Sequence, residues 1–282
     1  MEAGQQNDIR IGFIVQARMK SDRLPGKVMM PVPLETGKPL LRWITDELNT
    51  LYTYGEVIVA TSVDESNNKL VSYCQENNIK CFRGNEEDVL SRFIAVAKEN
   101  KFDHIVRLTG DNPIVDAGIL MTVINQHSAQ RVDYTKTEGL PLGMNFEIMT
   151  TAAVLDLEFK TLTPEEHEHV TLHIRNNSSY KKNTYSVATK EGIAQLRLTI
   201  DYPSDFIVLS TLLSLKDVND SESIGLSFVE AVYEKYPWLF DLNRTNFQKK
   251  QFNSIEEEME EACKLLLNSD FKRAVEKLRR AN

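Results

Sequence analysis

The sequence predicts an α/β fold, with a mostly parallel central sheet, helices on both of its faces and a helical extension at the carboxyl end. In the first half of the 282-residue chain, short apolar runs rich in β-branched residues alternate with segments whose apolar residues recur at helical spacing. This alternation is typical of parallel sheets covered on both faces. A composition of 41% hydrophobic and 26% charged residues fits a packed globular core.

Strands and helices are expected in strict alternation through the first half. The strands are predicted at 9–16, 57–61, 79–82 and 104–108, where apolar and β-branched residues cluster. The helices are predicted at 38–51, 65–77, 88–97 and 119–124, where apolar residues fall on one helical face. Each predicted helix follows a predicted strand, as the connections of a parallel sheet require.

The middle of the chain breaks this alternation, because residues 134–145 are rich in turn formers. Further strands are expected at 146–149, 184–189 and 195–200, and further helices at 164–176 and 205–215. From Asn243 onward the chain is charged, with a helical pattern and an apolar side. We therefore place a main domain at 1–242 and a C-terminal helical appendage at 243–282, which is expected to pack on the domain or on a partner subunit.

The charge and cysteine content exclude several classes of protein. A formal net charge of −8 argues against general binding to a nucleic-acid backbone, so an anionic ligand needs a local basic cluster. Cys74, Cys81 and Cys263 have no metal-ligand spacing and suit a reducing compartment. Because the first ten residues are polar and no run of 18 apolar residues occurs, we expect a cytoplasmic protein without a membrane partner.

The segment 16–27 (QARMKSDRLPGK) directly follows the first predicted strand, at the sheet edge where α/β folds bind ligands. Guanidinium groups fork onto phosphate oxygens, a lysine ammonium adds a compact charge, and Gly26 lets backbone amides come close. We therefore predict a phosphate-binding loop, although four charges on a loop can also simply be solvated. The loop lacks both the GxxxxGK[ST] and the GxGxxG patterns. Its basic residues are Arg18, Lys20, Arg23 and Lys27.

Two aspartates each follow a predicted strand and precede a turn that contains proline. Asp111 follows the strand at 104–108, and Asp201 follows the strand at 195–200. Strand-end carboxylates far apart in sequence can meet over one phosphate site and hold Mg²⁺. Capping of the turn is the alternative for Asp111, because an Asx residue close before proline often initiates a turn.

A histidine cluster and a glutamate are further candidates. His169 and His173 are four residues apart on the predicted helix, which is a possible zinc spacing. A third ligand at suitable spacing is not evident, so the zinc reading is the weaker one, and His167 and His173 are expected to be structural or exposed. Glu147 follows the glycine-containing turn at 140–143 and is either an acceptor-binding residue or an ordinary strand-edge glutamate.

Several blocks of the sequence resemble SpsF-like cytidylyltransferases, which are relatives of the synthetases of CMP-activated 3-deoxy-manno-octulosonate and CMP-sialic acid. The likeness begins with QARMKSDRLPGK at 16–27 and GKPLL at 37–41. It continues through VATS at 59–62, FRGNEEDVLSR at 82–92, VRLTGDNPIVD at 106–116, residues 141–147, EHVT at 168–171 and LRLTIDYPSD at 196–205. It implies a Rossmann-like fold of the nucleotide-diphospho-sugar transferase type.

The resemblance also implies functional positions, with CTP as the nucleotide and Mg²⁺ held by Asp111 and Asp201. The expected catalytic residues are Arg18, Arg23, Lys27 and Asp111. The expected nucleotide contacts are Gln16, Ala17, Arg18, Met19, Ser21, Arg23, Lys27, Ala60, Thr61, Ser62, Gly84, Asn85, Asp88, Thr109, Gly110 and Asp111. The expected acceptor contacts are Asn112, Glu147, Glu168 and His169.

We thus expect an Mg²⁺-dependent cytidylyltransferase that transfers CMP from CTP to a sugar acid or a related polyol or phosphate, releases pyrophosphate and serves surface polysaccharide biosynthesis as a homodimer. A glycosyltransferase with a nucleotide-sugar donor stays open, although its usual Asp-x-Asp motif is missing at the predicted strand ends. A regulatory nucleotide-binding module also stays open, but the basic loop and both aspartates count against it. The acceptor stays unnamed, because residues 24–27 depart from the sialic-acid synthetases toward the octulosonate type and because the chain is extended at its carboxyl end.

Overall fold

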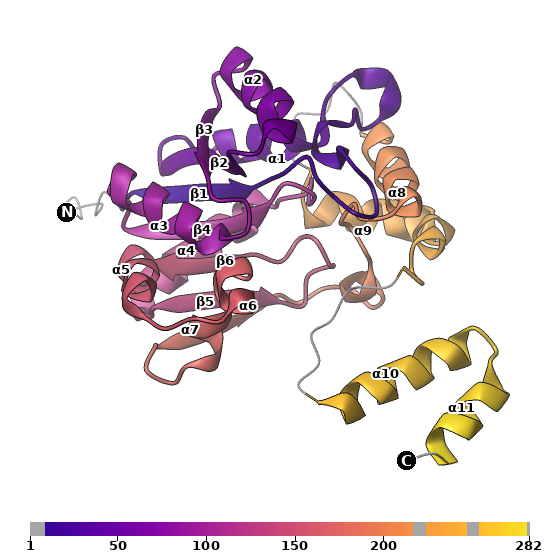
Figure 1. The fold of residues 1–282 in the computed structure, drawn as a ribbon. Helices are drawn as coiled ribbons and strands as arrows, with labels where there is room; N and C mark the ends of the chain where they lie inside the picture. The colour runs from indigo at the N-terminus through magenta and orange to yellow at the C-terminus, as the bar shows by residue number, and fades with distance from the viewer. Residues whose placement is uncertain (1–8, 217–223, 247–253, 281–282) are drawn as a thin grey trace, which may run out of the picture. The chain divides into compact units, whose positions relative to one another are not determined.

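The computed structural model describes residues 9–216, 224–246 and 254–280. Its central sheet has seven strands in the order β3-β2-β1-β4-β6-β5-β7 (Figure 1). The parallel half consists of β1 (Ile11–Gln16), β2 (Gly55–Ser62), β3 (Lys80–Gly84) and β4 (His104–Thr109). In the other half, β6 (Glu147–Thr150) runs antiparallel to β4 and β5 (Tyr134–Glu138), while β7 (Lys182–Ser186) is parallel to β5.

Helices cover both faces of this sheet, as the alternating pattern predicts. One face carries α1 (Leu40–Asn49), α2 (Asn68–Glu76), α4 (Ala117–Gln130), α8 (Pro203–Ser214) and α9 (Leu226–Lys235). The other carries α3 (Val89–Asn100), α5 (Thr151–Asp156) and α7 (Leu172–Asn176). Side chains alternate along each strand, so Phe13 and Val15 enter the first core while Ile14 enters the second. The predicted mostly parallel α/β fold is confirmed.

Three predicted elements differ in the structure. The turn-rich stretch 134–145 opens with β5, and its turn begins only at Gly139. The predicted helix at 164–176 is two short helices, α6 (Pro164–Glu168) and α7, because Val170 has a positive φ of 31° between them. His169 and His173 therefore do not share one helical face.

The predicted strand at 195–200 is not a strand. A 3₁₀ turn at Ile193–Gln195 is followed by a single bridge between Leu142 and Arg197. The hydrogen-bond partner changes along this run, from Leu142 at Leu198 to Asp111 at Ile200, so no continuous ladder forms. Asp201 consequently follows an extended segment rather than a strand.

The chain divides into two compact units, residues 1–245 and 246–282. The second unit contains α10 (Ile255–Asn268) and α11 (Lys272–Arg280), which pack on each other. Leu265, Leu267 and Phe271 are exposed there. Within the described residues, no helix is long and apolar enough to cross a membrane.

Candidate active site

The candidate site lies at the carboxyl edge of the parallel half of the sheet. The register places Gln16 of β1 beside Ala60 of β2 and Thr109 of β4. Backbone hydrogen bonds join their continuations, from Ala17 N–H to Ala60 O (3.1 Å) and from Gly110 N–H to Gln16 O (2.8 Å). Three predicted segments thus meet, because parallel strands bring their carboxyl ends to one edge.

Lys27 connects the basic loop to both aspartates. Its ammonium nitrogen lies 2.7 Å from Oδ2 of Asp111 and 2.8 Å from Oδ1 of Asp201, and it also donates to the carbonyl of Ile200 at 2.7 Å. The left-handed backbone of Gly26 (φ 74°) leads the chain into a short 3₁₀ helix that starts at Lys27 and leaves this lysine 7% exposed. The carboxylates of the two aspartates therefore converge on one point, which the ammonium of Lys27 occupies.

Asp201 is surrounded by positive charge. Besides Lys27, Arg23 lies 2.9 Å from its Oδ1, and Arg197 donates to its Oδ2 at 3.0 Å. Burial alone raises the pKa of Asp201, but hydrogen bonding and charge from Lys27, with charge from Arg23 and Arg197, outweigh it and lower the pKa below its ordinary value. Asp201 is thus an ionised carboxylate at neutral pH.

Arg197 is a site residue that the sequence reasoning missed. Its side chain is 5% exposed, and its guanidinium forms a double hydrogen bond with the fully buried Asp205, at 2.8 and 3.0 Å. Asp205 also accepts the backbone N–H groups of Asp201 and Tyr202, both at 2.9 Å. The only sequence signal of Arg197 is that it is a basic residue inside an apolar run. A buried arginine requires a partner. The pair fixes the turn that presents Asp201.

The rest of the basic loop faces the same edge. Arg23 stacks on the ring of Tyr202, with its guanidinium carbon 4.8 Å from the ring centroid. The N–H of Met19 donates to Asn67 Oδ1 at 2.8 Å, which anchors the loop to the start of α2. Arg18 is exposed, and in the described part of the chain neither its side chain nor that of Ser21 has a polar partner. Arg18 is therefore available to a ligand.

The convergence of Asp111 and Asp201 suits Mg²⁺, which typically takes one or two carboxylates and completes its shell with water and phosphate oxygens. The described residues contain no group of three or more histidine, cysteine or acidic side chains that could enclose a metal. His173 instead pairs with Glu166 at 2.8 Å. The donor set thus fits a metal shared with a substrate better than it fits zinc.

On the β2–β3 side, Ala60, Thr61 and Ser62 end β2, and Gly84 ends β3. Ser62 donates to the carboxylate of Glu86 and accepts from Asn67 at 2.7 Å. Asn85 accepts the N–H groups of Glu87 and Asp88. These contacts make a turn that closes this end of the sheet edge.

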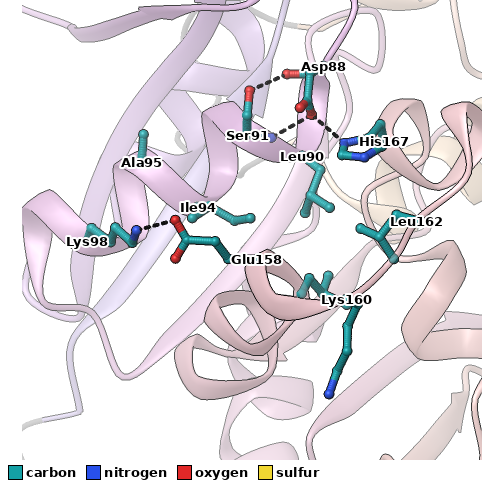
Figure 2. Close-up of a pocket in the computed structure, with 11 residues that line it drawn as sticks. Asp88, Leu90, Ser91, Ile94, Ala95, Lys98, Glu158, Lys160, Leu162 and His167 are labelled. Atoms are coloured by element: carbon teal, nitrogen blue, oxygen red, sulfur yellow. Dashed lines mark hydrogen bonds and ion pairs between the residues drawn. The ribbon is translucent and has the colours of Figure 1, made fainter.

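The side chain of Asp88 is engaged at the start of α3. It caps α3 by accepting the N–H of Ser91 at 2.8 Å, and it lies 3.1 Å from His167 Nδ1. Figure 2 shows this pair at one end of a groove beside α3, with Lys98 directed at Glu158 elsewhere along it. The groove has a volume of about 290 Å³ and apolar walls that include Leu90, Ile94 and Leu162. The contacts of Asp88 thus support α3 and one wall of this groove.

The predicted acceptor residue Glu147 is the centre of a buried network at the start of β6. Its carboxylate accepts from Arg107 at 2.6 Å, from Thr171 at 2.9 Å and from the hydroxyl of Tyr134. Burial raises the pKa of Glu147, but the charge of Arg107, together with these hydrogen bonds, lowers it overall. Both carboxylate oxygens are therefore engaged by the protein.

Arg107 links this network to the nucleotide side, because its Nε donates to Gln16 Oε1 at 3.1 Å. The sequence reasoning missed Arg107 and Thr171, although both lie inside the quoted motifs. Glu168 is exposed and His169 half-buried, and among the described residues neither side chain has a polar partner. The amide oxygen of Asn112 is buried and has no hydrogen-bond partner within the described part of the chain. Arg107 thus joins the two sides of the site.

Comparison with known proteins relates this chain to cytidylyltransferases. Residues 12–263 match the family model described as cytidylyltransferase. The spore coat polysaccharide biosynthesis protein SpsF of Bacillus subtilis is 36% identical over 230 residues, which cover 78% of this chain and 94% of that protein. A 3-deoxy-manno-octulosonate cytidylyltransferase of Synechococcus elongatus is 26% identical over 137 residues, covering 47% of this chain and 53% of that enzyme.

Solved structures give the same relationship. A cytidylyltransferase from Leptospira borgpetersenii superposes with a TM-score of 0.74 at 26% identity, covering 86% of this chain and all of that one. A CMP:2-keto-3-deoxy-manno-octonic acid synthetase, solved in complex with CTP, has a TM-score of 0.58 at 16% identity, covering 73% of this chain and 98% of that one. The second likeness concerns the fold alone.

Proposed function

Because this chain belongs to the cytidylyltransferase family, we propose that it transfers a cytidylyl group from CTP to an oxygen of an acidic sugar-type acceptor and releases pyrophosphate. The observation that carries the proposal is the convergence of Asp111 and Asp201 on the ammonium of Lys27, beside the basic loop. Two converging carboxylates can hold one cation between them, and the other basic side chains of the loop can then bind phosphates.

In the proposed reaction, the acceptor hydroxyl oxygen attacks the α-phosphorus and loses its proton to solvent, while the bond from the α-phosphorus to the oxygen bridging it to the β-phosphate breaks. Mg²⁺ held by Asp111 and Asp201 would supply charge neutralisation for the phosphoryl oxygens and the departing pyrophosphate. Arg18 and Arg23 bind phosphate oxygens, and Lys27 adds a fixed positive charge beside them. Positioning contributes most of the catalysis in phosphoryl transfer, so the chain needs no dedicated general base.

On the acceptor side, Arg107 presents a guanidinium held in place by Glu147 and Gln16. Arg175 adds a second guanidinium, 3.9 Å from Glu147, so the group carries more positive than negative charge. An acceptor with a carboxylate, phosphate or phosphonate complements this excess. The spore coat relative SpsF supports a role in making a surface polysaccharide.

The proposal is tested by pyrophosphate release with four nucleoside triphosphates against a panel of sugar acids, sugar phosphates and phosphonates. We expect release with CTP and an anionic acceptor, dependent on Mg²⁺. A matched panel of neutral sugars controls for the acceptor charge. Release with a different nucleotide, or transfer of a sugar from a nucleotide-sugar donor, would overturn the proposed reaction.

A further inference from the structure

Asn243 is a fully buried amide that directly follows a 3₁₀ helix, Pro237–Leu242. Leu239 and Phe240 of this helix lie in the first hydrophobic core, and the helix packs against α8 and α9. The position of Asn243 is therefore set by the core. Because a buried amide is costly to desolvate unless it is hydrogen-bonded, its partners indicate what it does.

Both hydrogens of the Asn243 amide are used within the protein. Its Nδ2 donates to the carbonyl of Arg197 at 2.9 Å and to Oδ1 of Asp205 at 3.0 Å. The reverse orientation of the amide would place its oxygen against these two acceptors, so the partners determine which way it points. Among the described residues, Oδ1 of Asn243 is buried without a partner. Asn243 thus serves here as a donor.

Asn243 holds the Arg197–Asp205 pair at two points. Oδ1 of Asp205 accepts from Nδ2 of Asn243 and from Nε of Arg197, the latter at 2.8 Å. The same asparagine binds the main-chain carbonyl of Arg197. Arg197 is therefore fixed at its backbone by Asn243 and at its guanidinium by Asp205, and removing the amide would loosen both members of the pair.

The pair in turn determines where Asp201 lies. Oδ2 of Asp205 accepts the N–H groups of Asp201 and Tyr202, both at 2.9 Å, and Nη2 of Arg197 donates to Oδ2 of Asp201 at 3.0 Å. The other carboxylate oxygen of Asp201 lies 2.8 Å from the ammonium of Lys27. The contacts that begin at the buried amide therefore end at a carboxylate that we assign to Mg²⁺.

We propose that Asn243 is a positioning residue for Asp201, acting through Arg197 and Asp205. This inference rests on the proposed function. Mg²⁺ demands nearly ideal octahedral geometry, with oxygen ligands at about 2.0–2.1 Å, so a loosely held carboxylate binds it less well. Groups that support metal ligands commonly change metal affinity by about 10–100-fold. Loss of the amide donor should therefore weaken Mg²⁺ binding without removing any residue that contacts the substrate.

The test measures CTP binding by isothermal titration calorimetry, once with EDTA and once with saturating Mg²⁺, without an acceptor so that no turnover occurs. The gain in CTP affinity that Mg²⁺ causes reports how well the site holds the metal, because the two ligands bind to linked positions. Asn243→Leu keeps the bulk of the side chain without its donors, and it should lose at least about fivefold of the gain seen in the parent. CTP affinity in EDTA should change little, since Arg18 and Arg23 are intact.

Asn100→Leu is the matched control, because the amide of Asn100 donates to the carbonyl of Val96 at the last turn of α3 and should not affect the gain. Asn243→Ser is the second variant, because it leaves room for a water molecule that can donate in place of the amide, and it should lose less of the gain than Asn243→Leu.

A purely structural residue would lower the urea midpoint of unfolding and leave the gain from Mg²⁺ unchanged, and that result in Asn243→Leu would overturn the proposal. If Asn243→Leu does not fold, Asn243→Ser decides alone. Failure of both variants to fold would assign Asn243 to folding and would also overturn the proposal. A parent that does not bind CTP, or whose CTP affinity does not respond to Mg²⁺, would instead refute the proposed function.

Discussion

Lys27 and Asp111 are 84 residues apart in the sequence, and their side chains form a 2.7 Å ion pair at the end of β4. The same ammonium lies 2.8 Å from Asp201, so one lysine forms ion pairs with two carboxylates from different loops. The pair therefore keeps the candidate metal ligands together before any substrate binds.

Lys27→Met tests this arrangement through stability. Removing the cation takes its ion pair from Asp111 and leaves Asp201 with Arg23 and Arg197, and breaking a buried ion pair typically costs roughly 3–5 kcal/mol. We expect a lower urea midpoint for the variant, and Mg²⁺ should restore more stability to it than to the parent. An unfolding free energy that is unchanged, with or without Mg²⁺, would contradict the structural role of Lys27.

Asp111→Asn tests the metal assignment through catalysis. The amide keeps the shape of the side chain but not its charge, so kcat should fall at least about a hundredfold if the carboxylate binds Mg²⁺. Asp103→Asn is the matched control, because Asp103 precedes β4 at the opposite edge of the sheet, where it accepts the N–H of Arg10. Near-normal kcat at saturating Mg²⁺ would exclude Asp111 as an essential ligand.

Much of the fold follows from local patterns. β1, β2 and β4 are recognisable because buried parallel strands are largely apolar, and the edge that they share with β3 follows from their parallel direction. β5 is not recognisable in the sequence because YTKTE is polar at every position after Tyr134 and precedes a glycine turn. The run at 195–200 has the apolar alternation of a strand, at Leu196, Leu198 and Ile200, but its hydrogen-bond partners change.

The site was less accessible to sequence reasoning than the fold. The loop at 16–27 and the two aspartates are visible because charged residues follow apolar runs. Arg107 and Arg197 lie inside a strand and an extended run, where a charge normally indicates an exposed face. Only the tertiary structure shows that Arg107 meets Glu147 and Arg197 meets Asp205.

Glu147→Gln tests the network on the acceptor side. The amide preserves volume but removes the charge that holds Arg107, so we expect the acceptor KM to rise about tenfold while CTP affinity changes little. The acceptor is the one that the pyrophosphate screen yields. Glu138→Gln, at the exposed end of β5, is the control. Loss of CTP affinity with intact acceptor kinetics would place Glu147 on the nucleotide side.

Arg23→Ala tests the phosphate loop. Charge-assisted contacts contribute roughly 1.5–3 kcal/mol, so CTP affinity should fall at least tenfold. CMP affinity should fall less, since the β- and γ-phosphates carry most of the charge. Arg10→Ala is a matched control, because Arg10 stacks on Phe102 at the other end of β1 as Arg23 stacks on Tyr202. Equal CTP affinities in all three proteins would refute phosphate binding by Arg23.

His127 should make the stability of the protein depend on pH. It is fully buried beside His104, and its Nδ1 shares a 2.8 Å hydrogen bond with Thr135. Burial, with the charge of His104, lowers the pKa of His127 from 6.5 to about 4. The unfolded chain therefore binds more protons between these values, and stability falls as pH decreases through this window.

The loss from His127 between pH 7.5 and pH 5 should be roughly 2 kcal/mol. Urea unfolding at both pH values measures it, in the parent and in His127→Asn, which cannot titrate. The variant should start less stable but lose less stability on acidification, with a remainder from His104, whose pKa burial also lowers. Equal losses in the two proteins would mean that His127 is not protonated on unfolding in this range.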